Sequence, residues 1–600
     1  MVTTKCIDAK NMTSLPSMFF YQAERFQQEP FIWGKKNGEY TSISWSDTKS
    51  KIISLANNLI SKFSVQPGDR IMIVSENRPE WFISDLAIKS IGALTVPTYT
   101  TNTAVNHLHI INNSGAKIAI VSSPELSKPL ITAASEADHD LTIIEMDEFS
   151  EGIGKNINKA NWNHLVNDKN TKLNYDLNKI TREDACSIIY TSGTGGLPKG
   201  VVLSHGGVLC NCDGAMEVVE GLSINNEVFL SFLPLSHSYE HAAGMHFPVS
   251  LGAQIYYCER VDALINRMAE VSPTIMTAVP RLYETMREKI IHRLKSQSYI
   301  RKWLFNKTIE LGRKEYEKLI PLNPLDLFIN FLCTILVRKK ILNTFGGRLK
   351  ALVTGGAPLN YDVGVFFTAL GIKILNGYGQ TEASPVISAN RPDNIRLHTV
   401  GPPLRGVSVK CANDGEILVK GELVMKGYWK DPDATISAIN DDGWLHTGDI
   451  GYIDNQGSLI ITDRKKDIIV NSGGDNISPQ KIEGMICLNE EIDQAAVYGD
   501  DKPYLTAVIV TNPEWTKKWI EENKFDIENE NLYENKNFTS KISRALLKTN
   551  KELSVIEKIK KFIFASEPFT TVNAQLTPTF KIRRHAIIRT YRNELDKLYR

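Results

Sequence analysis

The sequence predicts an α/β protein built on parallel sheets. Short apolar runs alternate with helical runs through most of the chain: residues 70–75, 117–123 and 141–146 are predicted as strands, and 79–92 as an intervening helix. Such alternation is typical of βαβ units whose strands pair in parallel. In these sheets the loops beyond the strand ends bind the ligand.

Composition limits the class of protein. At 600 residues the chain exceeds what one hydrophobic core supports, so we expect several domains. A net charge of +1 gives no bulk electrostatic reason for a nucleic-acid partner. The first residues lack the apolar core of a signal peptide, and we expect a protein of the reducing cytoplasm. Cys210 and Cys212 have no second pair at zinc-site spacing, so we expect ordinary buried thiols.

Beyond residue 400 the pattern changes. Residues 407–421 and 451–463 each predict a β-hairpin, turning at Asn-Asp-Gly and Asn-Gln-Gly. Ser478 followed by Pro479 predicts a helix N-cap and first helical residue. The polar run 521–541 predicts either a long solvated insertion or a helix pair.

The run 190–205, "YTSGTGGLPKGVVLSH", gathers hydroxyl groups, glycines and one lysine, which suits a loop that wraps phosphate oxygens. The Walker A pattern does not fit. Pro198 stands where the second glycine belongs, and Gly200 follows Lys199 where a hydroxyl is required. The loop alone therefore does not identify its phosphate chemistry.

Four more polar turns share this character. Residues 376–384, "NGYGQTEAS", place a carboxylate beside a hydroxyl, as a magnesium nucleotide site needs, and Tyr378 offers a flat face for a purine. The others are 443–451, "GWLHTGDIG", 462–479, "TDRKKDIIVNSGGDNISP", and 575–584, "QLTPTFKIRR". Each of these turns alone resembles an ordinary turn. Together with the run 190–205 they make five motifs in a fixed order, and this combination is far more specific than any one of them.

With these motifs the chain resembles the adenylate-forming enzymes, the superfamily of acyl-CoA synthetases, luciferases and peptide-synthetase adenylation domains, over about residues 20–590. Residues 232–241, 277–286 and 463–483 are most similar to bacterial long-chain fatty acyl-CoA synthetases. One departure is Gly195, which stands where the family's S-G-T-T-G loop has its second threonine.

The resemblance implies a large N-terminal domain, residues 1–463, made of parallel-sheet αβαβα subdomains and a small distorted β-barrel. It would contain the ATP and fatty-acid sites. A smaller, mobile α+β domain, residues 464–600, would follow, with a hinge at Lys466.

The resemblance also implies the nucleotide-binding residues. The β- and γ-phosphates of ATP would contact Thr191, Ser192, Gly193, Thr194 and Lys199. The adenine slot would consist of Gly355, Gly356, Ala357, Pro358 and Tyr378, and Asn376 and Gly379 are assigned to the same nucleotide site. Asp449 and Arg464 would bind the ribose.

Catalytic roles follow in the same way. Thr381 would contact the α-phosphate, and Glu382 would hold Mg²⁺ together with Thr194. Lys581 would bridge the fatty carboxylate and the α-phosphate, where a cation offsets repulsion between two anions. His237 would gate the fatty-acid tunnel, and Gly473 and Gly474 would line the coenzyme A channel.

The implied reaction has two halves. ATP converts a long-chain fatty acid to an acyl adenylate and releases pyrophosphate, and the thiolate of coenzyme A then displaces AMP. ATP, Mg²⁺ and coenzyme A are the implied cofactors, and no protein nucleophile is required.

Three alternatives compete with this interpretation. A ligase of the same superfamily acting on medium-chain or aryl carboxylates remains open. Amino-acid activation is disfavoured because the ammonium group of that substrate needs a carboxylate partner. Relatives have an Asp for it at the start of the stretch that is 233–241, "LPLSHSYEH", here, and no Asp is found there. A scaffold without catalysis is disfavoured because Glu382, Asp449 and Lys581 are all present.

The most apolar run, 325–337, is too short to span a bilayer and is flanked by lysine and arginine. It predicts either a helix lying on a membrane surface or a core helix with solvated ends. We expect peripheral contact with the inner face of the membrane through residues 296–340. A homodimer is compatible with the resemblance.

Overall fold

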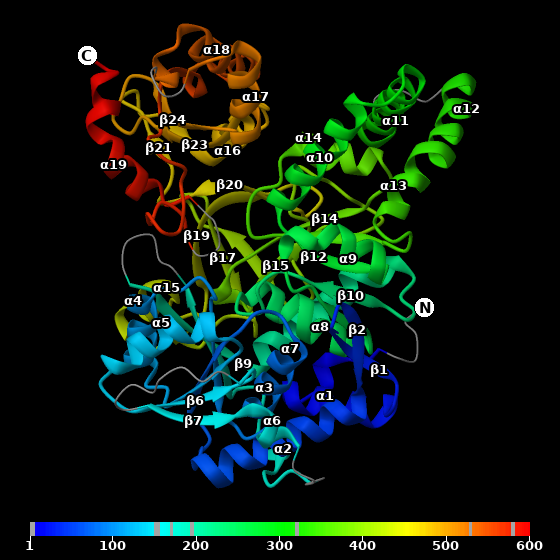
Figure 1. Ribbon diagram of the computed structural model, residues 1–600, viewed down its shortest axis with the longest axis vertical. Coiled ribbons are helices and arrows are strands. Elements are labelled where there is room, and N and C mark those ends of the chain that lie inside the picture. The colour runs from blue at the N-terminus through cyan, green and yellow to red at the C-terminus, as the bar shows by residue number, and fades with distance from the viewer. Residues whose placement is uncertain are drawn as a thin grey trace. The chain divides into compact units, whose positions relative to one another are not determined.

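The computed structural model describes residues 6–148, 157–167, 172–191, 197–318, 323–526, 531–577 and 582–600 (Figure 1). The chain divides into two compact units. The N-terminal unit comprises residues 1–447 and 452–460, and the C-terminal unit comprises residues 448–451 and 461–600. The change of unit at 460/461 lies close to the domain boundary expected at 463.

The first sheet of the N-terminal unit has the order β15-β14-β13-β12-β10-β11-β1-β2. Its inner neighbours pair in parallel, and β2 and β15 are antiparallel at the edges. The strands are β1 (Pro30–Lys36), β2 (Glu39–Ser44), β10 (Val228–Ser231), β11 (Gln254–Tyr257), β12 (Ile275–Ala278), β13 (Ala351–Thr354), β14 (Ile374–Gly379) and β15 (Val386–Ala389).

The second sheet has the order β18-β9-β8-β4-β3-β5-β6-β7. Its strands are β3 (Arg70–Val74), β4 (Leu94–Thr98), β5 (Ile118–Val121), β6 (Leu141–Glu145), β7 (Ile157–Asn161), β8 (Ala185–Thr191), β9 (Lys199–Ser204) and β18 (Gly427–Tyr428). The three predicted strands are β3, β5 and β6, and they pair in parallel, so this prediction is confirmed.

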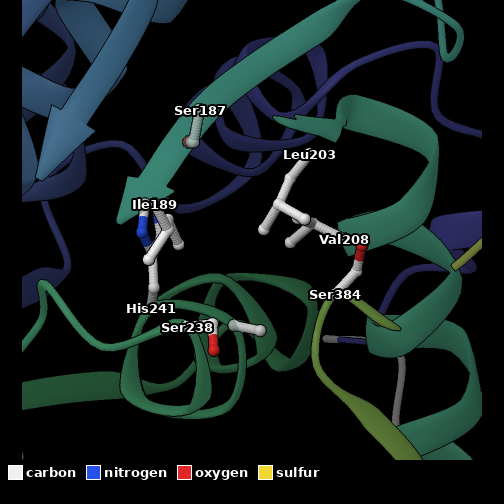
Figure 2. Close-up of a pocket in the computed structure, with 8 residues that line it drawn as sticks. Ser187, Ile189, Leu203, Val208, Ser238, His241 and Ser384 are labelled. Atoms are coloured by element: carbon white, nitrogen blue, oxygen red, sulfur yellow. The ribbon is translucent and has the colours of Figure 1, made fainter. Parts of the chain in front are cut away.

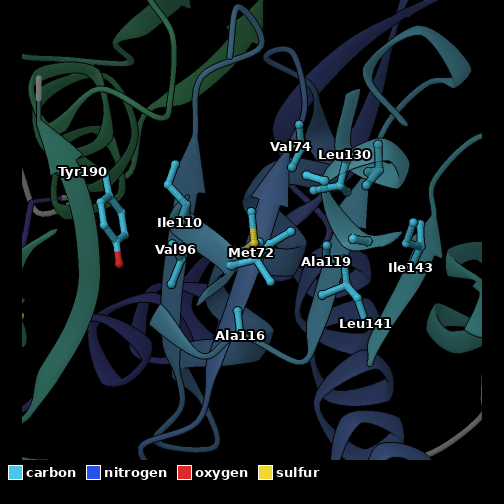
Figure 3. Packing of buried hydrophobic residues seen from close by; sticks show 14 of the residues in the cluster. Met72, Val74, Val96, Ile110, Ala116, Ala119, Leu130, Leu141, Ile143 and Tyr190 are labelled. Atoms are coloured by element: carbon cyan, nitrogen blue, oxygen red, sulfur yellow. The ribbon is translucent and has the colours of Figure 1, made fainter. Parts of the chain in front are cut away.

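Apolar side chains from this sheet form a continuous core with the helices that cover it. Met72 and Val96 point from β3 and β4 toward Ile110 of α4 (Ala104–Ser114), and Leu130 of α5 (Pro124–Ser135) closes the same layer (Figure 3). Each of these side chains is almost fully buried. Burial of such apolar area is the main source of stability for this part of the chain.

Helix α3 (Pro79–Lys89) is buried on almost all of its faces, as its apolar sequence predicts. The remaining helices outside residues 296–344 are α1 (Leu15–Phe26), α2 (Trp45–Phe63), α6 (Trp162–Val166), α7 (His205–Val219), α8 (Phe247–Leu251), α9 (Leu264–Val271), α10 (Pro280–Lys295), α14 (Tyr361–Ala369) and α15 (Pro432–Ala438).

Strands β16 (Ser408–Cys411), β17 (Glu416–Lys420), β19 (Leu445–Ile453) and β20 (Leu459–Arg464) form a four-stranded sheet, in the region where a distorted barrel was expected. Its order is β16-β17-β19-β20. Both predicted turns close with backbone hydrogen bonds, Ala412 N–H to Glu416 O and Asp454 N–H to Ser458 O.

The C-terminal unit is α+β. It contains the pair β21 (Ile469–Val470) and β22 (Asn476–Ile477), and the sheet of β23 (Ile492–Tyr498), β24 (Leu505–Thr511) and β25 (Ile559–Phe564). Its helices are α16 (Pro479–Ile486), α17 (Pro513–Asn523), α18 (Lys536–Asn550) and α19 (Arg584–Lys597). The Ser478 side chain accepts from Lys481 N–H, which confirms the predicted N-cap.

The polar run 521–541 belongs to a helix pair in its described part. It covers the end of α17 and the start of α18, and the Trp519 and Phe538 rings of these helices lie 5.0 Å apart, centroid to centroid. Phe538 is fully buried. Of the two alternatives, the helix pair is therefore the one observed, and it encloses an aromatic core.

The described residues between 299 and 344 form helices that expose apolar side chains. They are α11 (Tyr299–Glu317), α12 (Pro324–Cys333), the π-helical η6 (Thr334–Arg338) and α13 (Lys339–Thr344), and α11 and α12 lie side by side (Figure 1). Leu325, Leu327, Phe328, Phe331 and Leu336 are each more than half exposed. The alternative of a core helix is therefore wrong. Among the described residues, every helix is too short or too polar to cross a bilayer.

Candidate active site

Thr381 and Glu382 follow a sharp turn at the end of β14, called the Thr-Glu turn below. A Cβ at Gly379 would lie 2.0 Å from the Pro385 carbonyl oxygen, so only glycine fits there. The chain then enters the 3₁₀ turn η7 (Thr381–Ala383). The Thr381 hydroxyl lies 2.9 Å from the Ser238 hydroxyl, and the Glu382 carboxylate accepts a 2.9 Å hydrogen bond from the Tyr428 hydroxyl.

The residues expected to form the adenine slot lie at the ends of two neighbouring parallel strands or directly after them. Gly355, Gly356, Ala357 and Pro358 come directly after β13, and Tyr378 lies on β14, half-buried. The Tyr239 hydroxyl donates to Val353 O at 2.9 Å, and a Cβ at Gly355 would lie 3.8 Å from the Tyr239 ring. Gly356 has φ +83°, which favours glycine. The adenine-slot residues therefore share one sheet edge.

Asn376 links strand β14 to the segment that follows β15. Its side chain is buried, and its amide donates to Thr399 O at 3.1 Å. This contact ties β14 to the chain that follows β15, so the role of Asn376 in the structure is to hold the strand that bears Tyr378.

The described ends of the phosphate loop meet at one place. Thr191 ends β8 and pairs in register with Lys199, the first residue of β9. Ser192, Gly193, Thr194 and the departure at Gly195 lie outside the described residues. The Lys199 ammonium lies 3.4 Å from Asp431 Oδ2 and 5.1 Å from the centroid of the Tyr428 ring.

Residues 425–431 connect the phosphate loop to the Thr-Glu turn. Met425 N–H donates to Glu382 O at 2.9 Å, and Trp429 N–H donates to Gly200 O at 2.7 Å. No role was predicted for this segment from its sequence. Its only local signal is Asp-Pro at 431–432, where the Asp431 side chain caps α15.

His237 lies in the turn after β10 and is half-buried. Its Nδ1 accepts from Tyr239 N–H at 3.1 Å, and its ring centroid is 6.5 Å from that of Tyr99. Ser238 and Tyr239, the next two residues, contact Thr381 and Val353. The predicted gate residue thus lies beside residues that contact Thr381 and strand β13, which precedes the predicted adenine slot.

Glu240 begins the π-helical segment η4 (Glu240–His246) and is fully buried. Burial raises the pKa of this carboxyl to about 7, against hydrogen bonds from Ser231 and Thr277 that lower it. The Thr277 hydroxyl donates to Glu240 Oε2. A carboxyl that titrates near neutrality therefore lies directly behind Tyr239.

A buried charge cluster joins α3 to η4. The ammonium of Lys89 lies 2.7 Å from Asp85 Oδ2, 2.8 Å from His241 Nε2 and 3.4 Å from His246 Nε2. Within the described residues, Asp85, His241 and His246 are the group of possible metal ligands whose donor atoms lie within 4.8 Å of one another. Lys89 already supplies the cation at their centre. Burial, followed by the Lys89 charge, lowers the pKa of His246 well below its usual value.

His241 also lines a small cavity (Figure 2). The other lining residues are Ser187, Ile189, Leu203, Val208, Ser238, Ala242 and Ser384. The cavity therefore lies between β8, β9, α7 and the residues around the Thr-Glu turn.

The remaining predicted residues belong to the C-terminal unit. Asp449 is buried, and its Oδ1 accepts from Arg464 Nε at 2.9 Å. Lys466 is exposed in the turn after β20. Gly473 and Gly474 form an exposed turn closed by Gly474 N–H to Asn471 O at 2.9 Å. Lys581 lies outside the described residues.

Residues 19–429 match the family model of AMP-binding enzymes, and residues 466–600 match the model of the AMP-binding enzyme C-terminal domain. The chain belongs to the AMP-binding enzyme family. It is similar to the long-chain-fatty-acid–CoA ligase FadD15 of Mycobacterium tuberculosis, with 30% identity over 94% of this chain and 93% of that protein. It is also similar to long-chain-fatty-acid–CoA ligase 5 of Rattus norvegicus, with 31% identity over 94% of this chain and 85% of that protein.

Solved structures of AMP- and ATP-bound proteins share the fold. The adenylation domain of a carboxylic acid reductase from Segniliparus rugosus, in complex with AMP, superposes with a TM-score of 0.74 at 19% identity, covering 98% of this chain and 95% of that one. ATP-bound MatB from Rhodopseudomonas palustris gives 0.70 at 22% identity, covering 97% and 100%. The predicted family and fold class are confirmed.

Proposed function

We propose that this AMP-binding enzyme activates long-chain fatty acids with ATP to acyl adenylates and then transfers the acyl group to coenzyme A. The observation that supports the substrate class most directly is the similarity, across more than nine-tenths of the chain, to relatives that are long-chain-fatty-acid–CoA ligases. ATP and coenzyme A are then substrates of the two half-reactions.

Within the N-terminal unit, the sheet edge formed by β13 and β14 supports the proposed nucleotide site. The adenine would lie between Gly355–Pro358 and Tyr378. Thr381, whose hydroxyl is held 2.9 Å from that of Ser238, would contact the α-phosphate. Thr191 and Lys199, at the two ends of the phosphate loop, would contact the β- and γ-phosphates.

The residues present fit a magnesium ion bound together with a nucleotide. Mg²⁺ prefers hard oxygen ligands and is usually held by one or two carboxylates plus substrate phosphates and water. Glu382 supplies such a carboxylate, half-exposed and next to the Thr381 hydroxyl. When bound, the ion would neutralise charge on the phosphates. The second proposed ligand, Thr194, rests on the resemblance.

In the C-terminal unit, Asp449 is the proposed acceptor for the ribose hydroxyls. Its carboxylate is oriented by Arg464, which donates to it at 2.9 Å. Lys581 is the proposed cation between the fatty carboxylate and the α-phosphate, and His237 the proposed gate. We also propose Lys466 as a hinge and Gly473 and Gly474 as the coenzyme A contact. The match of the C-terminal family model begins at residue 466, which supports a boundary there.

Residues 296–340 are proposed to contact a membrane surface. The run contains nine Lys or Arg and four Asp or Glu, and α12 exposes large apolar side chains. Apolar side chains beside an excess of cations suit the interface of a bilayer that contains anionic lipids. An enzyme docked there meets a substrate that partitions into the bilayer.

One assay tests the proposal. Pyrophosphate release and coenzyme A-dependent AMP release would be measured with palmitate, shorter fatty acids, benzoate and an amino acid. We expect the highest kcat/KM with long-chain fatty acids. Higher kcat/KM with benzoate or medium chains would favour the alternative carboxylates, and no turnover with any acid would contradict the proposal.

A further inference from the structure

Tyr428 lies between the two charged groups that the proposed reaction uses. Its hydroxyl donates to Glu382 Oε1 at 2.9 Å, and its ring faces the Lys199 ammonium at 5.1 Å from the centroid. Glu382 follows β14 of the first sheet, and Lys199 begins β9 of the second. One aromatic side chain therefore contacts both the proposed magnesium carboxylate and the proposed phosphate-binding cation.

The backbone around Tyr428 is fixed from two sides. Residues 427–428 form the short strand β18, paired antiparallel with β9, so that Tyr428 is opposite Val201. Tyr428 N–H also donates to the Thr435 hydroxyl of α15 at 2.9 Å. At Gly427 a Cβ would lie 2.7 Å from the Thr435 methyl carbon, which keeps this contact close. The direction of the Tyr428 side chain is thus set by the fold.

A flexible glutamate needs such support to present one oxygen geometry to a metal. A neutral phenol that donates to one carboxylate oxygen restricts rotation of the group and leaves its negative charge in place. Partners that orient a metal-binding carboxylate in this way typically change metal affinity by 10–100-fold when they are removed.

The ion pair between Lys199 and Asp431 is easily broken. Its partner Asp431 is 3.4 Å away, and both side chains are substantially exposed, at 46% and 39%. Exposed ion pairs are weak. A nucleotide phosphate carries more negative charge than Asp431. It can therefore replace Asp431 as the partner of the Lys199 ammonium while the Tyr428 ring remains beside that ammonium.

We propose that Tyr428 is a positioning residue that sets the Glu382 carboxylate for the nucleotide-bound metal and holds Lys199 over the phosphate site. This inference rests on the proposed function. Tyr428 acts through its contacts with Glu382 and Lys199.

Binding of a non-reacting ATP analogue, α,β-methylene-ATP, tests the role. Its affinity would be measured calorimetrically with Mg²⁺ and with EDTA, for wild type, Tyr428→Phe, Tyr428→Leu and a matched control, Tyr40→Phe. Tyr40 likewise donates one hydrogen bond, to Tyr257 O at 3.0 Å, far along the sheet from β14.

Tyr428→Phe is expected to reduce the gain in affinity that Mg²⁺ provides by about tenfold, with the affinity in EDTA unchanged. Tyr428→Leu, which also removes the ring, should weaken binding in EDTA by about two- to fivefold. Tyr40→Phe should leave both values unchanged. In acyl-adenylate formation, Tyr428→Phe should raise the Mg²⁺ concentration at half-maximal rate and leave the KM for fatty acid unchanged.

A double-mutant cycle separates positioning from general damage. If Tyr428 acts through Glu382, adding Tyr428→Phe to Glu382→Gln should cost nothing further in Mg²⁺-dependent affinity. The inference is overturned if Mg²⁺ raises the affinity of Tyr428→Phe for the ATP analogue as much as it does in wild type. It is also overturned if Tyr428→Phe no longer unfolds cooperatively. If wild type forms no acyl adenylate from any carboxylic acid, the proposed function fails instead.

Discussion

At the residue scale, Glu382 is the acidic side chain on which the proposed magnesium site depends. Replacing it with alanine removes one half-exposed carboxylate and one hydrogen bond from Tyr428, so the fold should persist. Because metal charge neutralisation supplies several kcal/mol of transition-state stabilisation, we expect acyl-adenylate formation to fall by at least about a hundredfold. ATP-dependent acyl-AMP formation measures it.

The exposed Glu220→Ala is the matched control and should retain wild-type rates. An unchanged rate of acyl-AMP formation in Glu382→Ala would contradict the metal role.

Glu240 predicts a pH dependence of stability. Burial raises the pKa of its carboxyl from 4.5 in the unfolded chain to about 7 in the folded protein. Between these values the unfolded chain gives up this proton first, so the contribution of Glu240 to stability falls as pH rises. Above pH 7 the cost is about 3 kcal/mol. Glu240→Gln should therefore be more stable than wild type at pH 8 and similar at pH 4.5.

Urea unfolding at pH 4.5 and pH 8 measures this difference, with Glu220→Gln as control. A stability difference between Glu240→Gln and wild type that does not vary with pH would mean that Glu240 does not titrate in this interval.

At the element scale, α12 has apolar side chains that the rest of the described N-terminal unit leaves exposed. We expect Leu327→Ser/Phe328→Ser/Phe331→Ser to reduce partitioning onto anionic vesicles by at least about tenfold, because each side chain loses apolar area that would be buried in the interface. Co-sedimentation with phosphatidylglycerol vesicles measures it.

The control replaces two exposed apolar residues elsewhere, Val555→Ser/Val572→Ser, and should bind as wild type does. Equal binding of wild type and the α12 variant would eliminate this surface as the docking site. Raised salt should weaken wild-type binding, since lysines and arginines flank the helix.

The elements that the sequence predicted share a local cause. Strands β3, β5 and β6 are buried on both faces, so each is a short continuous apolar run between turns, and the sequence displays it. The α16 start was predictable because Ser478 and Pro479 are adjacent. The exposure of α12 was not predictable, because an apolar run has the same sequence pattern whether the folded protein buries it or leaves it exposed to solvent.

Contacts between distant segments could not be predicted in this way. Glu382 and Tyr428 are 46 positions apart, and Lys89 and His241 are 152 positions apart. Their pairing follows from which strands adjoin in the folded sheets, which a single sequence does not display. Local motifs therefore predicted the turns of the proposed nucleotide site, whereas the side chains that contact these turns emerged only from the structure.

At the scale of the whole molecule, the two half-reactions of the proposed function place opposite requirements on the space around the reacting carbonyl. Adenylation needs a cation between the fatty carboxylate and the α-phosphate. Thioester formation needs that space open, so that the thiol of coenzyme A can approach the same carbonyl. The chain is built as two units, and we propose that Lys466 lets the C-terminal unit serve each step in turn.

This proposal predicts that two variants fail in opposite ways. Lys581→Ala should reduce adenylation by about a hundredfold or more, because a developing charge loses its cation, and should spare thioester formation from supplied acyl-AMP. Lys466→Pro should show the reverse, because proline fixes φ where a hinge must change it. Lys466→Ala, which removes the charge but keeps the backbone free, should retain both half-reactions. If the Lys581 and Lys466→Pro variants are folded and lose both half-reactions equally, a single arrangement serves both steps and the hinge does not exist.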